Sequence, residues 1–154
     1  METLAPAASP PPVLILDTQV VMDWLVFGYQ GMGALINALE LGTVEWIGTP
    51  SMLDELKHVL GRGVAARWSP DLAHIEAVFA RHCRMRPLPT LGHGRPRCTD
   101  PDDQKFVDLA IAERVDWLIS RDKAVLALRK RVARLGPQIL TPEPWCALWQ
   151  ARAN

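Results

Sequence analysis

The segment Val13–Leu16 is apolar at every position and ends directly at an acid, Asp17. A strand with one face in water alternates apolar and polar residues, whereas an uninterrupted apolar run is typical of a parallel strand buried on both faces. We therefore predict a buried parallel strand over this segment, with a carboxylate at its carboxyl end.

Short apolar runs and helical stretches alternate along the rest of the chain. Further strands are predicted over residues 44–47, 84–86, 117–119 and 138–140. Helices are predicted over residues 18–27, 32–41, 49–60, 69–83, 102–114, 124–134 and 141–149. This alternation indicates an α/β fold, a three-layer sandwich in which a mostly parallel central sheet is flanked by helices on both faces.

The length of 154 residues suits one compact domain, which we predict over residues 13–150. Residues 1–12 are rich in Ala and Pro and lack the features of a signal peptide, so we expect a disordered leader. No segment approaches the roughly 20 apolar residues of a membrane span. Three widely spaced cysteines form no paired zinc motif and predict a reduced, cytoplasmic protein.

Two carboxylates follow predicted strands. Asp17 closes the first strand, and Asp122 comes shortly after the strand over residues 117–119. Ligands of open α/β sheets bind outside the carboxyl ends of the strands, so both acids are candidates for a functional site. The alternative for either acid alone is an ordinary helix N-cap.

A third candidate, Glu55, lies on the helix predicted from Thr49. At about 100° per residue, Glu55 borders the apolar face of this helix, whereas Asp54 points nearly opposite. Glu55 is therefore the better candidate for a site. The alternative is that Glu55 is an ordinary solvent-exposed acid, stabilised by the helix dipole near the start of the helix.

The fourth candidate, Asp103, begins a helix and projects into its apolar stripe, beside Val107 and Ala110. A buried carboxylate is costly unless it is compensated, and neighbouring acids raise one another's pKa, so a divalent cation would explain the arrangement. The alternative is a cluster of helix caps around Pro101, to which Asp100 and Asp102 would belong.

Carboxylates suit Mg²⁺ or Mn²⁺, hard cations that take oxygen ligands and are usually held together with substrate phosphate. One or two such ions would polarise a phosphate, lower the pKa of a bound water and stabilise a leaving oxygen. Such a site would not require a Ser, His or Cys nucleophile. A phosphotransferase of the haloacid type needs a second Asp where this chain has Gln19.

Four stretches resemble the PIN-domain family, in particular the branch of VapC-like ribonucleases that are the toxins of toxin–antitoxin systems. They read VLILDTQVV, TPSMLDEL, CTDPDDQKFVDLAIAERVDWLISRD and ILTPEPW. The resemblance implies catalytic or metal-binding roles for Asp17, Glu55, Asp103 and Asp122, with Thr18, Ser120 and Asp100 in support. It also implies an RNA substrate, a cognate antitoxin and a homodimer.

The chain departs from the family pattern at Gln19, Gln104 and Ala124, where Asn or Asp is common. These departures bear on the residues that orient the metal ligands, and they leave a catalytically degenerate binding module as an alternative to a nuclease. A nuclease acting on DNA is the second alternative.

A net charge of zero means that a nucleic acid must be met by a local basic patch. The residues proposed to contact the phosphate backbone are Lys123, Arg129 and Lys130. A run such as RKRVAR is also common on a solvated helix face, which is the alternative.

Overall fold

The computed structural model describes residues 9–152. The predicted leader over residues 1–12 therefore falls largely outside the described residues. No helix between residues 9 and 152 is long and apolar enough to cross a membrane.

Five strands form one sheet with the order β3-β2-β1-β4-β5, and every neighbouring pair is parallel. The strands are β1 Val13–Leu16, β2 Glu45–Gly48, β3 Cys83–Met85, β4 Trp117–Ile119 and β5 Gln138–Leu140. The predicted parallel sheet is confirmed, with all five strands within one residue of the expected positions.

The strands β1, β2, β4 and β5 contribute side chains to two separate cores, one on each face of the sheet, whereas the edge strand β3 contributes only Cys83, to the first. In β1, Leu14 and Leu16 belong to one core, while Ile15 between them belongs to the other. In β4, Ile119 belongs to the first of these cores and Leu118 to the second. Because both faces are covered, neither face needs polar residues, which explains the apolar runs in the sequence.

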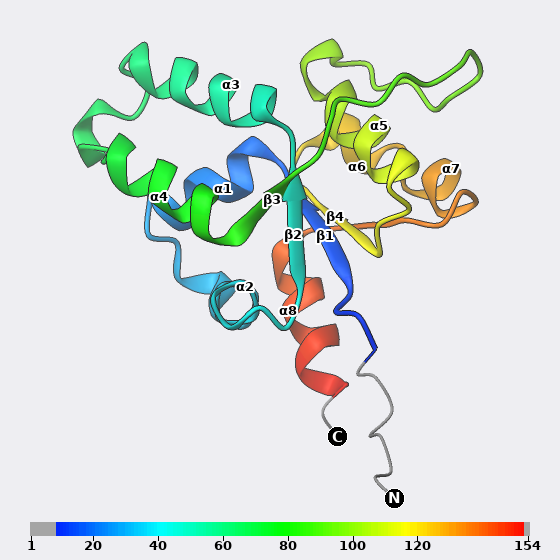
Figure 1. Cartoon of the computed structure of the whole chain (residues 1–154), viewed down its shortest axis with the longest axis horizontal. Coiled ribbons are helices and arrows are strands. Elements are labelled where there is room, and N and C mark those ends of the chain that lie inside the picture. The colour runs from blue at the N-terminus through cyan, green and yellow to red at the C-terminus, as the bar shows by residue number, and fades with distance from the viewer. Residues whose placement is uncertain (1–8, 153–154) are drawn as a thin grey trace, which may run out of the picture.

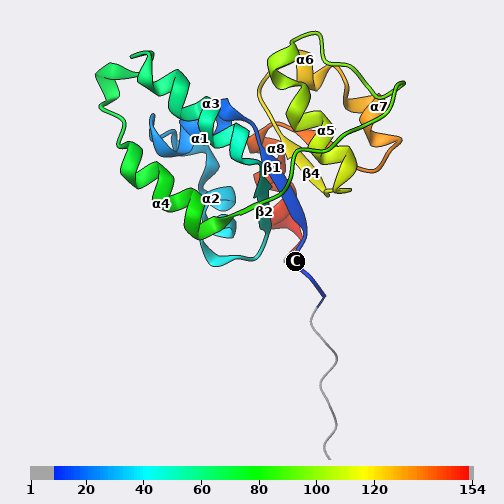
Figure 2. The same cartoon turned by 45° about the horizontal axis from the view of Figure 1, so that its top comes forward.

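Helices cover both faces, as predicted (Figure 1). The first core is covered by α1 Thr18–Leu25, α2 Gly33–Leu41, α3 Pro50–Gly61, α4 Leu72–His82 and α8 Pro142–Ala151. The second core is covered by α5 Gln104–Ala112, α6 Lys123–Leu126 and α7 Arg129–Ala133. Figure 2 shows the same separation from another side, with the strands between α1–α4 and α5–α7.

Two predicted helices differ from the structure by more than two residues at an end or by a break. The helix expected from residue 69 begins at Leu72, because Ser69 has a positive φ of 47° and Asp71 caps the first turn through the N–H of His74 at 3.1 Å. The helix expected over residues 124–134 divides into α6 and α7 where the N–H of Leu128 bonds the carbonyl of Val125, three residues back. Such a tightened turn keeps the apolar spacing of a continuous helix, so periodicity alone cannot reveal it.

The strand order reverses direction at β1. From β1 the chain builds β2 and then β3 on one side, and later β4 and β5 on the other. In open parallel sheets a crevice forms outside the carboxyl ends of the two strands where the order switches. Here those strands are β1 and β4, which are followed by Asp17 and by the segment 120–122.

Candidate metal centre

A cavity of about 330 Å³ lies outside the carboxyl ends of β1 and β4. Its walls come from the start of α1, the end of α3, the start of α5 and the segment after β4. The lining residues are Asp17, Thr18, Gln19, Met22, Val59, Asp103, Arg121 and Asp122. Three of the four acids predicted for the site therefore line one cavity.

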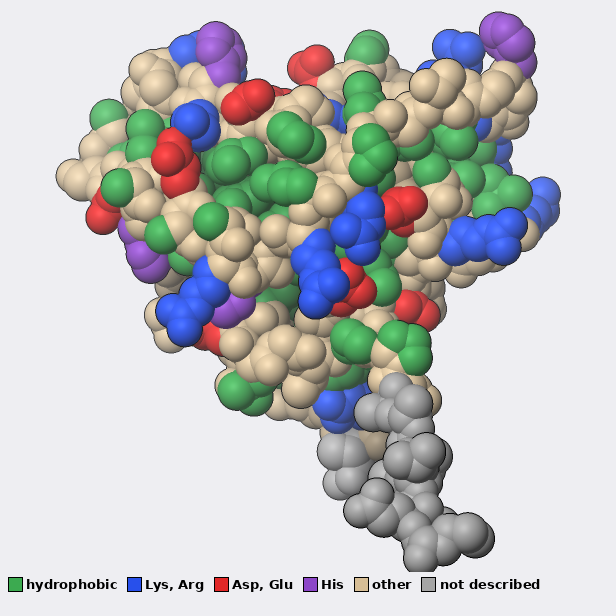
Figure 3. Space-filling model, in the orientation of Figure 1, with side chains coloured by type: hydrophobic (Ala, Val, Ile, Leu, Met, Phe, Trp, Pro, Cys, Tyr) green, Lys and Arg blue, Asp and Glu red, His purple; other side chains and the backbone are tan. Residues whose placement is uncertain are grey.

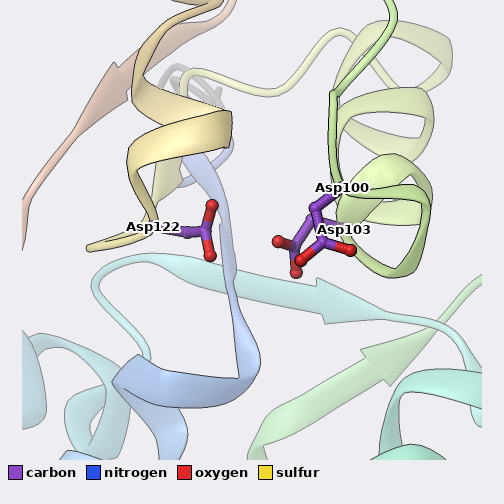
Figure 4. A group of neighbouring side chains, drawn as sticks. All are labelled: Asp100, Asp103 and Asp122. Atoms are coloured by element: carbon purple, nitrogen blue, oxygen red, sulfur yellow. The ribbon is translucent and has the colours of Figure 1, made fainter.

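Three carboxylates come together at this edge of the sheet. Asp100, Asp103 and Asp122 each offer an oxygen, and these oxygens lie within 4.8 Å of one another. Figure 4 shows the carboxylate of Asp122, at the start of α6, facing those of Asp100 and Asp103 at the start of α5. The cluster thus joins two stretches of chain that are separated by the whole of α5 and β4.

One oxygen of Asp103 is buried and has no hydrogen-bond partner among the described residues. Burial, followed by the charges of Asp122 and Asp100, raises the pKa of Asp103 to about 7. An acid in this position needs either a proton or a positive charge beside it. Since all three clustered ligand atoms are carboxylate oxygens, the residues fit a hard divalent cation better than zinc, which favours nitrogen and sulfur ligands.

Asp17 is buried beside this cluster, with 3% of its surface exposed. It accepts hydrogen bonds from the N–H of Val20 at 3.0 Å and from the hydroxyl of Ser120. Burial raises its pKa to about 6, although the bonds from Ser120 and Val20 lower it. Asp17 is therefore held in one orientation but carries its negative charge at a cost.

Ser120 connects two acids. Its hydroxyl donates to Asp17 and accepts a bond from the N–H of Asp122 at 3.0 Å. Ser120 is fully buried, so its hydroxyl is shielded from bulk water. The predicted supporting role of Ser120 thus has a geometric basis, whereas Thr18 lines the cavity without a side-chain hydrogen bond in residues 9–152.

The helix-cap alternative and the site interpretation are compatible for both strand-end acids. Asp17 caps α1, and Asp122 caps α6 by accepting from the N–H groups of Ala124 at 2.8 Å and Val125 at 3.4 Å. Because each cap fixes its side chain, capping also determines where the carboxylate stands in the cavity. Ala124, one of the departures, contributes only its backbone to this arrangement.

Glu55 lies apart from the three clustered acids. As the helical wheel predicted, it is partly buried while Asp54 is exposed. Its carboxylate forms an ion pair with Lys105 of α5. Glu55 precedes Val59 by one turn of α3, so it stands beside the cavity wall, but its charge is taken up by an ammonium group.

Gln19 and Gln104, the other two residues that differ from the family pattern, form side-chain hydrogen bonds. Gln19 donates to Asp23 at 2.9 Å. Gln104 accepts from the N–H of Cys98 at 2.6 Å and donates to Asp108 at 2.8 Å, which fixes the loop before the acidic cluster to α5. Both glutamines therefore support the walls of the cavity.

Sequence reasoning overlooked Arg121, whose guanidinium lines the cavity and joins three elements. It donates to Asp23 of α1 at 2.8 Å and to Glu143 of α8 at 2.6 Å, and it lies 4.9 Å from the ring centroid of Tyr29. The bonds to Glu143 and Asp23 raise the pKa of Arg121, and Arg121 lowers the pKa of Glu143. Arg121 lies between Ser120 and Asp122 in the sequence. Its partners Asp23 and Glu143 are far from it in the sequence, so no local pattern indicated its role.

The predicted phosphate contacts are exposed on the α6–α7 side of the molecule. Lys123 follows Asp122 directly, and Arg129 and Lys130 line a separate shallow cavity of about 290 Å³. Figure 3 shows Lys and Arg side chains gathered near α7, at the right of the view. These residues lie outside the acidic cavity and adjoin it through Lys123.

A family model described as PIN domain matches residues 13–124, which is most of the chain and includes all four predicted acids. No curated protein and no solved structure matches the chain significantly.

Proposed function

Because the chain belongs to the PIN-domain family, we propose that it is a Mg²⁺- or Mn²⁺-dependent endoribonuclease and the toxin of a toxin–antitoxin pair. PIN domains are generally nucleases that use divalent metals. The choice of RNA over DNA and the toxin role are supported by the resemblance of the motifs around Asp17, Glu55 and the acidic loop 100–103.

The observation that carries this proposal is the acidic cluster, in which Asp100, Asp103 and Asp122 each offer an oxygen within 4.8 Å of the others. In addition, one oxygen of Asp103 is buried without a hydrogen-bond partner among the described residues. Asp103 and Asp122 would hold the ion, with Asp100 and Asp17 completing the set. A cation bound there would polarise a phosphate oxygen and lower the pKa of a bound water.

The protein's own residues prepare the site in three ways. Ser120 orients Asp17 and the backbone of Asp122 through one hydroxyl. The raised pKa values of Asp17 and Asp103 mean that protons occupy these carboxylates in weakly acidic solution and leave them as the pH rises. Ionised carboxylates repel a phosphodiester, so substrate binding depends on the cation that neutralises them.

Contacts to the nucleic acid are assigned to the exposed cations beyond Asp122. Lys123, Arg129 and Lys130 lie on the same side of the sheet as the cluster from α5 and α6. Phosphate contacts by such residues position a strand without reading its sequence, so they would set affinity and not the cleavage motif.

We further propose a homodimer, a cognate antitoxin that blocks the cavity, and a cytoplasmic location. The first two are supported by the family resemblance alone. The third is supported by Cys83, Cys98 and Cys146, all of which are free thiols, as expected in a reducing compartment.

Cleavage of a fluorescent RNA and of DNA with the same sequence tests the activity, each with Mg²⁺, Mn²⁺ or EDTA. We expect metal-dependent cleavage of RNA that is lost in Asp17→Asn and Asp103→Asn. Asp54→Asn, which removes an exposed acid of α3, is the matched control and should keep full activity.

Three results would change the assignment. Equal activity in the wild type and both site variants would reject the site. Faster cleavage of DNA would replace the substrate. Binding of RNA without cleavage by a folded, metal-loaded wild type would favour the degenerate binding module.

A further inference from the structure

The ion pair between Glu55 and Lys105 joins the two sides of the molecule beside the cavity. Glu55 belongs to α3, which covers one face of the sheet, and Lys105 belongs to α5, which covers the other (Figure 1). Val59, one turn after Glu55, lines the cavity, and Asp103, two residues before Lys105, lies in the acidic cluster. The pair therefore connects two walls of the same site.

Lys105 is held firmly in this position. Its ammonium also donates to the carbonyl of Asp102 at 2.7 Å and lies 5.3 Å from the ring centroid of Phe106. Only 19% of its side chain and 29% of that of Glu55 are exposed. A second pair between helices, Lys57 with Glu76, is 41% and 47% exposed and resembles an ordinary surface ion pair.

A carboxylate that is paired with an ammonium is not free to bind a metal ion. To reach Glu55, a divalent cation would have to displace Lys105 and leave a partly buried ammonium without its partner, which is costly. The buried oxygen of Asp103, by contrast, has no hydrogen-bond partner within residues 9–152. The two acids thus differ: Asp103 is free to bind a cation, whereas the charge of Glu55 is already neutralised by Lys105.

We propose that Lys105 takes the place of a second divalent cation at Glu55, so that the protein binds one ion, at Asp103 and Asp122. The ammonium of Lys105 then supplies at Glu55 the positive charge that a second ion would bring. This inference rests on the proposed function, because it concerns how many ions the nuclease site holds.

Calorimetric titration of the full chain with Mn²⁺, without nucleic acid, tests the inference through stoichiometry. We expect one ion per chain in the wild type and two in Lys105→Met, in which Glu55 is released. Glu55→Gln should still bind one ion, because Glu55 is not a ligand of the first. Lys57→Met, which removes an equal charge from the other helix pair, is the matched control and should bind one.

A second variant and a second measurement guard against a Lys105→Met protein that does not fold. Lys105→Gln keeps a donor for the carbonyl of Asp102 while losing the charge, so it should also bind two ions even if Lys105→Met folds poorly. Electron paramagnetic resonance of the Mn²⁺ complexes should show coupling between two ions in the Lys105 variants and none in the wild type.

The results separate the inference from the proposed function. Two ions in the wild type, one ion in both Lys105 variants, or loss of the first ion in Glu55→Gln would overturn the inference and leave the nuclease assignment standing. No Mn²⁺ binding by the folded wild type would overturn the metal centre itself.

Discussion

Replacing Asp17 by Asn should make the metal-free protein more stable at neutral and alkaline pH while it abolishes activity. Asp17 is buried and its pKa is raised from 3.8 to about 6. The folded state therefore holds the proton more tightly than the unfolded state does, and folding becomes less favourable as the pH rises through the window from about 4 to 6. At 1.36 kcal/mol per pH unit, the ionised carboxylate costs the fold about 3 kcal/mol at pH 8.

Asn removes this cost but also disturbs one hydrogen bond. Its carbonyl can still accept from the N–H of Val20, while its amide group faces the hydroxyl of Ser120, which has lost its acceptor. A lost bond of this kind costs about 1 kcal/mol. We therefore expect Asp17→Asn to be about 1–2 kcal/mol more stable than the wild type at pH 8, and about as stable as the wild type at pH 4.5, where the partly ionised carboxylate costs only about 1 kcal/mol.

Urea denaturation in EDTA at pH 4.5 and pH 8 measures both differences, and Asp54→Asn, on the exposed side of α3, serves as the control. Adding Mn²⁺ at pH 8 should stabilise the wild type more than the variant, because only the wild type has the carboxylate of Asp17 to complete the ligand set of the ion. A variant that is less stable than the wild type at pH 8 in EDTA would refute the reasoning. In that case the charge of Asp17 would be compensated within the protein and would not call for a cation.

Further substitutions and conditions give separate tests. Mn²⁺ affinity measured by calorimetry should rise by up to about tenfold per pH unit below pH 7, where Asp103 loses its proton, and should then level off; a flat profile would contradict the raised pKa. Ser120→Ala should lower the free energy of unfolding by about 1–2 kcal/mol in urea and weaken Mn²⁺ binding, because Asp17 loses its hydroxyl donor. Arg121→Ala leaves two carboxylates without their shared cation and should cost about 1–3 kcal/mol in thermal denaturation, with Arg121→Lys recovering part of it. Phe106→Ala empties a site in the second core and should cost about 3–5 kcal/mol, measured in urea; a loss below 1 kcal/mol would mean that the core collapses around it.

The strands could be predicted from the sequence because burial on both faces leaves an uninterrupted apolar pattern. Val13–Leu16 and Trp117–Ile119 are read directly in this way. The division of the predicted helix 124–134 could not, since Val125, Leu128 and Val132 keep helical spacing across the break. Periodicity records which side chains are buried, but not whether one backbone bond spans three residues or four.

The candidate site was predictable where an acid follows a strand or begins a helix, as Asp17, Asp103 and Asp122 do. The pairing of Glu55 could not be predicted, because its partner Lys105 lies on another helix, on the opposite face of the sheet. Arg121 shows the same limit, since its partners come from α1 and α8. Local pattern identifies which residues are candidates, whereas pairing between distant elements decides which of them carry a free charge.

The reversal of strand order at β1 has a consequence for synthesis of the protein. The first 85 residues supply β1, β2 and β3 with Asp17 and Glu55, while Asp100, Asp103 and Asp122 come later in the chain. A ribosome that has translated only these residues has therefore made one side of the crevice without the other. Fragments released early lack the facing carboxylates, so the acidic cluster can form only in finished or nearly finished copies of the chain.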